Sequence, residues 1–341
     1  MGAATSKSTI KKNKTKILFV GNRKSSFVKN DYTRLQKKFN VIPISMSSTS
    51  LPIFLFKTFF LVKWSDVVFC WFASWGSFFP VLFGRLLKKK SIVVAGGYDC
   101  ANEPKINYGA FTNLKEKIPA SFVLKNANVV LAVSNFTKDE MLKKVKPRQF
   151  KLIYNGVDTE KYKPSGEKEI NLVITVGGIN WNNLKRKGLE TFVKSAKYLP
   201  KTHFVVIGKF TDDSIDYLKS IASSNVEFTG FVSDRDLIKW YQRAKVICQL
   251  SYYEAFGLTP AEGMACGCIP VVTRERAGLP EFVAGTGFYV PYGDEKATTE
   301  AIKKALNAPN ETGKKARERI VRMFPIEKRG KELVRIMEKI V

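Results

Sequence analysis

The sequence predicts an α/β protein in which two domains, each built on a doubly wound parallel sheet, face a central cleft. From residue 16 onward, short runs of β-branched residues alternate with helical stretches, which is the pattern of parallel strands joined by crossover helices. A polar break at residues 164–168 separates this series from a second one of the same kind. At 341 residues the chain is also too long for one typical core and fits two domains.

The first domain is expected over residues 16–165, after a disordered basic tail at residues 1–15. Its strands are expected at residues 17–20, 40–44, 67–72, 91–95, 129–133 and 151–154. The tail starts with Met1 and Gly2 and fits an N-myristoylation pattern, although an ordinary disordered segment has the same composition.

The second domain is expected over residues 166–324, with strands at residues 172–176, 204–207, 226–229, 246–249, 269–272 and 287–290. A last helix, within residues 325–341, follows Phe324 and Pro325. Two doubly wound domains place their ligand between them, at the carboxyl ends of the strands.

Two apolar segments of the first domain raise the question of a membrane. Residues 51–63 form an aromatic helix bounded by lysines, which fits an interfacial helix and a core helix equally well. Residues 67–84 contain no charge and approach membrane-spanning length. Because Ser74, Gly76, Ser77 and Pro80 interrupt that run, we expect a buried strand, a turn and a helix, and no transmembrane helix.

The most informative segment spans residues 253–270, where Glu254 and Glu262 bracket a glycine turn and the start of a helix. Thr259, Pro260 and a glutamate three residues after the threonine signal that start. A helix N-terminus suits a phosphate, and carboxylates accept hydrogen bonds from sugar hydroxyls. A nucleotide sugar needs both, although Glu262 also fits a capping box with Thr259 and Glu254 fits a solvated loop position.

The string from Ser251 to Val272, with its two glutamates eight positions apart, resembles the E-x7-E signature of the retaining glycosyltransferases of family 4. The resemblance extends from about Lys16 to the C-terminus and is looser in the first half. It implies the GT-B fold, with two Rossmann-like domains, and a last helix that crosses back onto the first domain. In that family, Glu254 would hold hydroxyls of the donor sugar and Glu262 those of the ribose.

The resemblance also implies how the donor diphosphate is held. The pair Lys187 and Gly188 matches a Lys-Gly pair that opens a helix in the family, whereas Gly178 stands where a basic residue is common. Arg186 or Lys185, after a longer loop at residues 180–184, is expected to supply the missing charge. Gly230, Phe231 and Val232 resemble the loop beside the nucleotide base.

The expected reaction starts with cleavage of the bond between the anomeric carbon and phosphate. Lys187, Arg186 and the backbone around Ala255, Phe256, Gly257, Leu258 and Thr259 would bind the donor and stabilise the charge that grows on the diphosphate. The resemblance implies front-face attack, with the departing phosphate taking the proton of the acceptor. Asp99, which follows the strand at residues 91–95, is a further catalytic candidate, or else a turn aspartate.

Other catalytic systems find little support in the sequence. The single histidine, His203, begins an apolar strand, so neither a Ser-His-Asp nor a Cys-His system is expected. Asp234 and Asp236 form an Asp-x-Asp pattern, but Ser233 before them reads as a helix N-cap with acids in the first turn. We therefore expect no metal ion and no cofactor.

The charge indicates an anionic partner. The chain carries 57 basic and 30 acidic residues, a formal net charge of +27, and residues 1–160 hold 27 of the basic and 9 of the acidic ones. Since a GT-B enzyme receives its acceptor in this half, an anionic membrane or a lipid-linked or glycan acceptor is the preferred explanation. A nucleic acid is an unlikely partner, because no nucleic-acid-binding pattern is present.

Five cysteines without metal-ligand spacing, and no visible signal peptide, indicate a cytoplasmic protein, peripheral on the cytoplasmic face of a membrane. Two alternatives stay open. The same fold could serve a sugar phosphorylase or a nucleotide-sugar epimerase, and the charge alone could serve a basic nucleic-acid-binding protein. The sequence does not identify the sugar or choose between uridine and guanosine.

Overall fold

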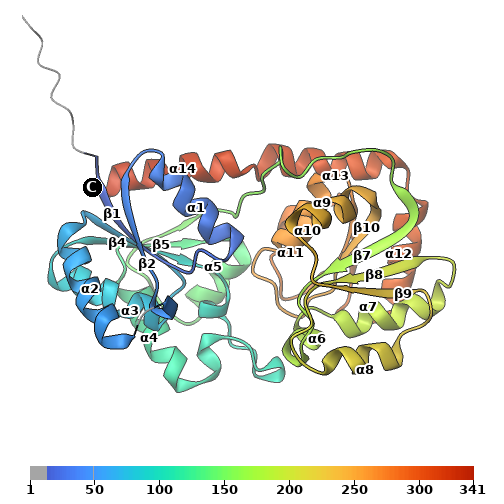
Figure 1. The fold of residues 1–341 in the computed structure, drawn as a ribbon, viewed down its shortest axis with the longest axis horizontal. Helices are drawn as coiled ribbons and strands as arrows, with labels where there is room; N and C mark the ends of the chain where they lie inside the picture. The colour runs from blue at the N-terminus through green and yellow to red at the C-terminus, as the bar shows by residue number, and fades with distance from the viewer. Residues whose placement is uncertain (1–13, 49) are drawn as a thin grey trace, which may run out of the picture.

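The structure is a computed structural model that describes residues 14–48 and 50–341. It contains two lobes side by side, each with its own six-stranded parallel sheet (Figure 1). This arrangement confirms the predicted fold class. The predictions made for the basic tail, including myristoylation, fall almost entirely on residues 1–13, which lie outside the described part of the chain.

The first sheet has the strand order β2-β1-β3-β4-β5-β6. Its strands are β1 (Lys16–Val20), β2 (Asn40–Ile44), β3 (Val67–Trp71), β4 (Lys90–Ala95), β5 (Val129–Ala132) and β6 (Phe150–Leu152). β3 is buried along its whole length, as expected for a central strand covered on both faces.

Helices cover both faces of this sheet. One face packs against α1 (Ser26–Gln36) and α14 (Ile326–Ile340). The other packs against α2 (Leu51–Trp64), α3 (Trp75–Leu86), α4 (Leu114–Asn126) and α5 (Asn135–Leu142). The uncharged run at residues 67–84 is therefore a strand, a turn and the larger part of a helix, as predicted. Within the described residues, no helix has the length and apolar character needed to cross a bilayer.

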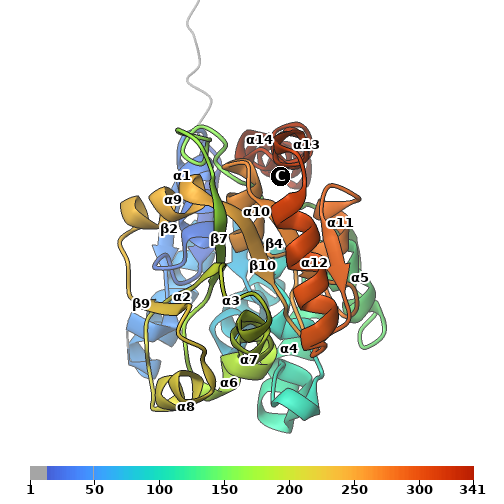
Figure 2. The ribbon, with the colours of Figure 1, turned by 90° about the vertical axis from the view of Figure 1, so that its right-hand side faces the viewer.

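The second sheet has the strand order β12-β11-β10-β7-β8-β9. Its strands are β7 (Glu169–Val176), β8 (His203–Ile207), β9 (Val226–Gly230), β10 (Ala244–Gln249), β11 (Ile269–Thr273) and β12 (Phe288–Val290). α7 (Leu189–Ser195), α8 (Ser214–Ile221) and α12 (Glu295–Asn307) cover one face, and α9 (Asp234–Arg243) and α10 (Leu258–Ala265) cover the other. Figure 2 shows this domain end-on, with the sheet between α10 and α12.

Three shorter or peripheral helices complete the second domain: α6 (Trp181–Arg186), α11 (Leu279–Val283) and α13 (Asn310–Met323). α6 corrects a prediction, because residues 180–184 were expected to form a loop. Asn180 caps this helix, with its side chain accepting a hydrogen bond from the N–H of Asn183. An asparagine is common in loops, but Asn180 is here the N-cap residue that starts a helix.

α14 returns to the first domain, as expected from the family resemblance (Figure 1). Val157 pairs with the chain at Pro325. Beyond that point the Arg329 guanidinium binds the Asp31 carboxylate with two hydrogen bonds of 2.7 Å, and both side chains are buried. The same guanidinium donates to the backbone carbonyl of Ile153. The C-terminal helix is thus bound to the first domain by a buried ion pair.

Candidate active site

A cavity of about 270 Å³ lies between the two domains, at the carboxyl ends of both sheets. The first domain lines it with Ser26, Phe27, Trp71, Gly96 and Asn155. The second domain lines it with Lys187, Glu254, Ala255, Phe256, Gly257, Leu258, Thr259 and Glu262. The structure therefore brings most of the predicted second-domain residues together in one place.

The helix in the predicted signature, α10, begins at Leu258 and not at Pro260 as expected. Gly257 is its N-cap, with φ at 93°, and a Cβ there would lie 2.5 Å from the Leu279 Cδ2. No side chain caps the helix, so the capping box of Thr259 and Glu262 is absent. The N–H groups of Leu258 and Thr259 donate to no acceptor in the described part of the chain. They are available to an anion.

Lys187 and Glu254 face each other on the wall that the second domain contributes. The Lys187 Nζ lies 3.9 Å from the Glu254 Oε2, and both side chains are largely buried. Burial lowers the pKa of the Lys187 ammonium, and the Glu254 carboxylate opposes that shift. Gly177 makes room for the lysine stem, because a Cβ there would lie 2.6 Å from the Lys187 Cδ. The Lys187 ammonium and the Glu254 carboxylate therefore lie together in a partly desolvated part of the cavity wall.

Glu262 lies one turn further along α10. Its carboxylate accepts a hydrogen bond from the Tyr241 hydroxyl at 3.2 Å. Burial raises the pKa of Glu262 to about 7, against the lowering effect of hydrogen bonds from Tyr241 and Tyr162. A carboxylate with an elevated pKa on a cavity wall is typical of a binding or catalytic group.

Arg186 and Lys185, which were predicted to supply the positive charge that Gly178 lacks, do not line the cavity. The Arg186 guanidinium donates to the Asn183 side chain at 2.8 Å and lies over the ring of Tyr108, 5.1 Å from its centroid. Because Tyr108 belongs to the first domain, Arg186 here forms part of the contact between domains. The Gly178 carbonyl accepts a hydrogen bond from Asn183, and the Lys185 side chain is exposed.

Asp99 is not brought into the cleft. Its carboxylate is buried and accepts hydrogen bonds of 2.9 Å from the N–H groups of Ala73 and Gly97. Burial raises its pKa to about 6, and these backbone hydrogen bonds oppose the shift. The side chain joins the loops that follow β3 and β4, beside Gly96, which does line the cavity. The expectation of a catalytic Asp99 is replaced by a structural role for this side chain.

The loop that was predicted to lie beside the nucleotide base follows β9. The Phe231 side chain is 77% exposed, whereas Val232 packs against the core beside Tyr241. Neither residue lines the cavity. The expected contact of this loop with the nucleotide base stays a prediction.

The sequence did not identify the cavity wall that the first domain provides. Trp71 ends β3, and its indole N–H donates to Asp31 at 3.0 Å. Asn155 is buried, and its Oδ1 has no hydrogen-bond partner among the described residues. The signal for Asn155 was the segment Asn155-Gly156-Val157-Asp158, which resembles the family's approach to its linker. Nothing in the sequence distinguished Trp71 from an ordinary core residue.

The two domains are in direct contact around this cavity. The Glu281 carboxylate, from the second domain, accepts hydrogen bonds from the N–H groups of Asn135 and Phe136 at 2.8 and 2.7 Å. These N–H groups begin α5 of the first domain, so Glu281 caps a helix across the domain boundary. Ser134 donates to the Ala255 carbonyl beside this cap.

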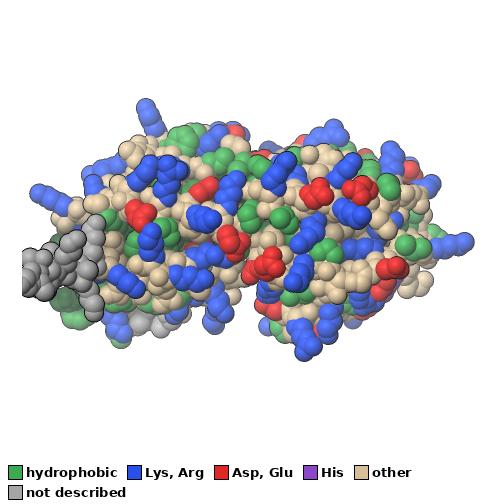
Figure 3. Space-filling model, turned by 90° about the horizontal axis from the view of Figure 1, so that it is seen from above, with side chains coloured by type: hydrophobic (Ala, Val, Ile, Leu, Met, Phe, Trp, Pro, Cys, Tyr) green, Lys and Arg blue, Asp and Glu red, His purple; other side chains and the backbone are tan. Residues whose placement is uncertain are grey.

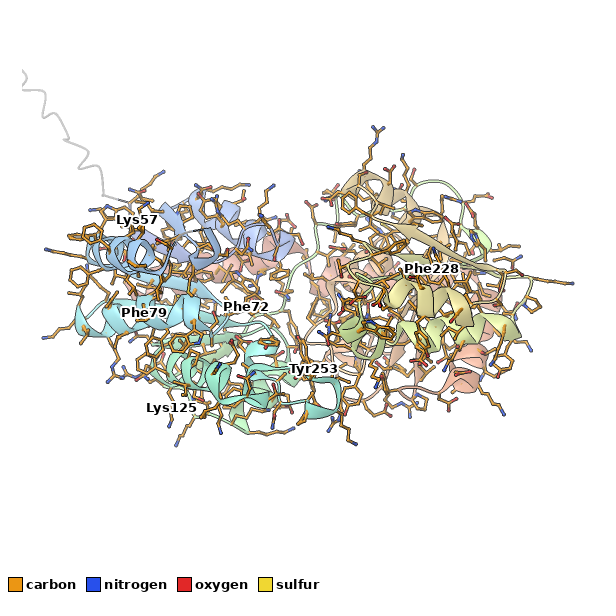
Figure 4. All side chains as sticks on the ribbon, turned by 60° about the horizontal axis from the view of Figure 1, so that its bottom comes forward. Lys57, Phe72, Phe79, Lys125, Phe228 and Tyr253 are labelled. Carbon is orange, nitrogen blue, oxygen red and sulfur yellow. The ribbon has the colours of Figure 1, made fainter. Side chains whose placement is uncertain are left out.

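The Tyr253 side chain also lies in the contact between the two domains. Tyr253 is buried against Tyr108 and Phe136 of the first domain, and its hydroxyl donates to the Gly97 carbonyl at 3.3 Å. Figure 4 shows its position between the two lobes. Arg276 adds an ion pair to Glu103. The structure therefore has its domains closed on one another.

The residues considered for other kinds of catalysis do not line the cavity. His203 pairs with Glu227 at 2.9 Å on the surface of the second sheet. Ser233 caps α9 through the N–H of Asp236, as predicted for the Asp-x-Asp segment. Within residues 14–48 and 50–341, no three His, Cys, Asp or Glu side chains form a group that could hold a metal ion.

Comparison with known proteins assigns both halves to glycosyltransferase families. The family model described as Glycosyltransferase Family 4 matches residues 24–161, and the model described as Glycosyl transferases group 1 matches residues 158–322. The O-antigen chain mannosyltransferase RfbU of Salmonella typhimurium is 28% identical over 195 residues, which are 55% of this chain and 53% of that protein. The alpha-maltose-1-phosphate synthase of Mycobacterium tuberculosis is 27% identical over 211 residues, 53% of this chain and 54% of the relative. The matched region thus spans about half the length of these curated relatives.

Solved structures show the same fold. The Anabaena protein HepE, solved with UDP and glucose, has a TM-score of 0.78 at 15% identity and covers 95% of this chain and 100% of its own. WaaG, a glycosyltransferase involved in lipopolysaccharide biosynthesis, has a TM-score of 0.71 at 14% identity, with coverage of 93% and 98%. The matched family models and the two facing parallel sheets agree: the chain belongs to glycosyltransferase family 4 and has the GT-B fold.

Proposed function

We propose that this protein is a retaining glycosyltransferase that moves a hexose from a UDP- or GDP-sugar to a lipid-linked, glycan or other hydroxyl acceptor. The observation that carries the proposal is the arrangement on the second-domain wall. There the Lys187 ammonium, the Glu254 carboxylate and the unpaired N–H groups that begin α10 line one cavity. The ammonium and the N–H groups suit the negative charges of a diphosphate, and the carboxylate suits the hydroxyls of a sugar.

The chemistry follows from where charge develops. As the bond between the anomeric carbon and phosphate breaks, Lys187 and the N–H groups of Leu258 and Thr259 stabilise the negative charge that grows on the diphosphate. Glu254 accepts hydrogen bonds from the donor sugar, and Glu262 accepts them from the ribose. Attack on the same face of the sugar then retains its configuration, and the leaving phosphate takes the proton of the acceptor. These groups supply the charge stabilisation without a metal ion or cofactor.

The first-domain wall is the side that receives the acceptor in this proposal. The unpartnered Oδ1 of buried Asn155 offers a hydrogen-bond acceptor to a hydroxyl there. For the donor, the relatives named as mannosyltransferases, among them a GDP-mannose:cellobiosyl-diphosphopolyprenol alpha-mannosyltransferase of Xanthomonas campestris (29% identical over 186 residues), support a GDP-sugar. HepE, solved with UDP and glucose, supports a UDP-sugar.

We place the reaction at the cytoplasmic face of an anionic membrane. α2 presents five apolar side chains to solvent, with Phe56 67% and Phe60 52% exposed; the others are Leu51, Ile53 and Phe59. Only Phe54, Thr58 and Val62 of this helix are buried. Lys57 lies on the outer side of the first domain, away from the second (Figure 4). An exposed aromatic face with flanking lysines is typical of a surface that binds a bilayer.

A thermal-shift panel tests the proposal and identifies the donor. Wild-type protein is heated with UDP, GDP and their hexose derivatives, because a ligand that binds only the folded state raises Tm. We expect one nucleotide series to raise Tm, and Glu254→Ala, Glu262→Ala and Lys187→Ala to reduce that shift. Glu300→Ala and Lys303→Ala change exposed residues of α12 and serve as controls. Shifts of wild-type size in all three cavity variants would contradict the proposed site.

A further inference from the structure

A second and larger cavity lies at the opposite end of the second sheet from the cleft. Its volume is about 1040 Å³. Ile170, Lys245 and Ile269, which line it, stand at the amino ends of β7, β10 and β11, whereas the cleft lies at the carboxyl ends of the same sheet. α13 and the segment around residues 164–168 form the remaining walls. None of the residues that line the cleft also lines this cavity.

Positive charge dominates the walls of this cavity. Its basic lining residues are Lys168, Lys245, Lys314, Lys315, Arg317, Arg319 and Arg322, and its acidic ones are Glu167 and Glu318. Of these seven basic residues, only Lys314 forms a salt bridge within the described part of the chain, to Glu311 at 3.5 Å. Figure 3 looks down on the face that carries α13 and shows Lys and Arg side chains prevailing over Asp and Glu on the second domain. Uncompensated like charges favour a bound anion.

Lys245 is the most informative of these residues. It is only 8% exposed, and its ammonium has no hydrogen-bond or ion-pair partner among the described residues, although it lines the cavity. The Nζ is not among the buried side-chain atoms that lack a partner, so the stem of Lys245 is buried while its ammonium stays accessible from the cavity. An anion in the cavity would supply the missing partner. Lys245 has no role in the proposed reaction.

Two arginines are already held in fixed positions on the α13 side. Arg317 donates to the carbonyl of Tyr162 at 3.1 Å and also to that of Ala265. Arg319 donates to the carbonyls of Phe282 and Glu281 at 2.6 and 2.7 Å. Burial and the neighbouring charge of Arg322 lower the pKa of Arg319. Cations that are fixed before binding lose less entropy when a ligand arrives.

We propose that this cavity binds a ligand that carries phosphate groups, at a site separate from the donor. Its size fits a small molecule, and the planar guanidinium groups on its walls suit phosphate oxygens. Arg319 also connects the cavity to the domain junction. It holds the backbone of Glu281, whose carboxylate caps α5 of the first domain. A phosphate bound at Arg319 is therefore placed to influence domain closure.

Inorganic pyrophosphate is the probe, and isothermal titration calorimetry is the measurement. All proteins carry Lys187→Met, so that the cleft no longer offers its own phosphate-binding cation. In this background, Lys315→Met with Arg322→Gln removes two exposed cations of the cavity. Lys245→Met, which keeps the buried stem, is a separate variant. The matched control is Lys303→Met with Lys304→Met, because both lysines are exposed on α12 and lie outside the cavity.

We expect the Lys187→Met protein and the α12 control to bind pyrophosphate equally. Each cavity cation removed should weaken binding by about tenfold, with circular dichroism and ligand-free Tm showing that the variants fold. No binding to Lys187→Met protein, or equal binding by the cavity variants and the α12 control, would overturn the proposal.

A second assay identifies the source of the phosphate. Sedimentation with phosphatidylglycerol vesicles compares wild-type protein with the Lys315→Met, Arg322→Gln variant. Unchanged sedimentation together with weakened pyrophosphate binding assigns the site to a soluble phosphorylated ligand. Loss of sedimentation in this variant, with the α12 control unaffected, assigns it to a lipid headgroup.

Discussion

The ammonium of Lys187, at the end of α6, lies 3.9 Å from the carboxylate of Glu254, which follows β10, and both residues line the cleft. Both side chains are more than four-fifths buried, so each charge acts in a partly desolvated environment. At this distance the pair is not held by a short hydrogen bond. In the proposed reaction the diphosphate binds beside the lysine and the donor sugar beside the glutamate.

Glu262→Gln should stabilise the protein at alkaline pH. The pKa of Glu262 is raised from 4.5 to about 7, so the folded state holds a proton that the unfolded state loses between these values. The contribution of Glu262 to stability therefore falls as pH rises from 4.5 to 7 and stays low above that. At pH 8 we expect Glu262→Gln to raise the free energy of unfolding by about 1–3 kcal/mol.

Urea unfolding at pH 5 and pH 8 measures this effect. The gain should be small at pH 5, where the wild-type carboxyl is mostly protonated. The pKa of Asp99 is also raised, but Asp99 contributes equally to the stability of both proteins, so its effect cancels in the difference between them. The same substitution should weaken binding of the nucleotide. A gain of the same size at both pH values would show that ionisation of Glu262 is not its cause.

Gly97→Ala should prevent the domains from closing. Gly97 has a φ of 121°, and a Cβ there would lie 2.5 Å from the Ala255 Cβ across the domain junction. We expect a larger radius of gyration in small-angle X-ray scattering and a loss of activity of about tenfold or more. Gly293→Ala is the control for an alanine at a positive-φ glycine, since its φ is 78° and a Cβ there would have no atom within 4 Å. Equal effects of the two substitutions would mean that backbone strain, and not closure, explains the loss.

Asp31→Asn should destabilise the first domain strongly. The Asp31 carboxylate binds Arg329 of α14, and the two side chains are 1% and 4% exposed. Because the substitution leaves a buried guanidinium without its counter-charge, we expect a loss of about 3 kcal/mol or more. Glu327→Gln breaks the exposed pair with Arg34 between the same two helices and should cost less than about 1 kcal/mol. Chemical unfolding compares the two variants, and similar losses would refute the anchoring role of Arg329.

Phe56→Ser with Phe60→Ser should reduce binding to anionic vesicles. These side chains provide much of the exposed apolar area of α2, and removing them lowers the free energy gained at the bilayer surface. Tyr198→Ser, in the second domain and 46% exposed, is the control for loss of one exposed aromatic side chain, because Tyr198 lines neither cavity. Sedimentation with phosphatidylglycerol vesicles is the measurement. Binding that is unchanged in the α2 variant would place the membrane contact elsewhere.

Much of the fold could be predicted, because strands buried on both faces read as runs of β-branched residues. Val67 to Trp71 is such a run, and so is Ile269 to Thr273. The position of Glu254 and Lys187 at the cleft also followed, since residues after parallel strands meet at one edge of a sheet.

The remaining features depend on tertiary contacts that the sequence does not display. The signal at Thr259 and Pro260 placed the start of α10 two residues too late, because the N-cap is Gly257, with a φ of 93° at a position where Leu279 and Phe282 leave no room for a Cβ. Asp99 was a catalytic candidate or else a turn aspartate, and the N–H groups of Ala73 and Gly97, which bind its carboxylate, fit the second alternative.

Transfer by the Glu254→Gln variant is the measurement that tests the central claim most directly. Wild-type protein and the variant receive the donor identified by thermal shift, together with a hydroxyl acceptor, and NMR follows the released nucleotide and the anomeric configuration of the product. We predict that wild-type protein gives a product of retained configuration, that Glu254→Gln is slower by about 100-fold or more, and that Glu300→Gln matches wild type. Transfer by Glu254→Gln at the wild-type rate, or a product of inverted configuration, would contradict the account.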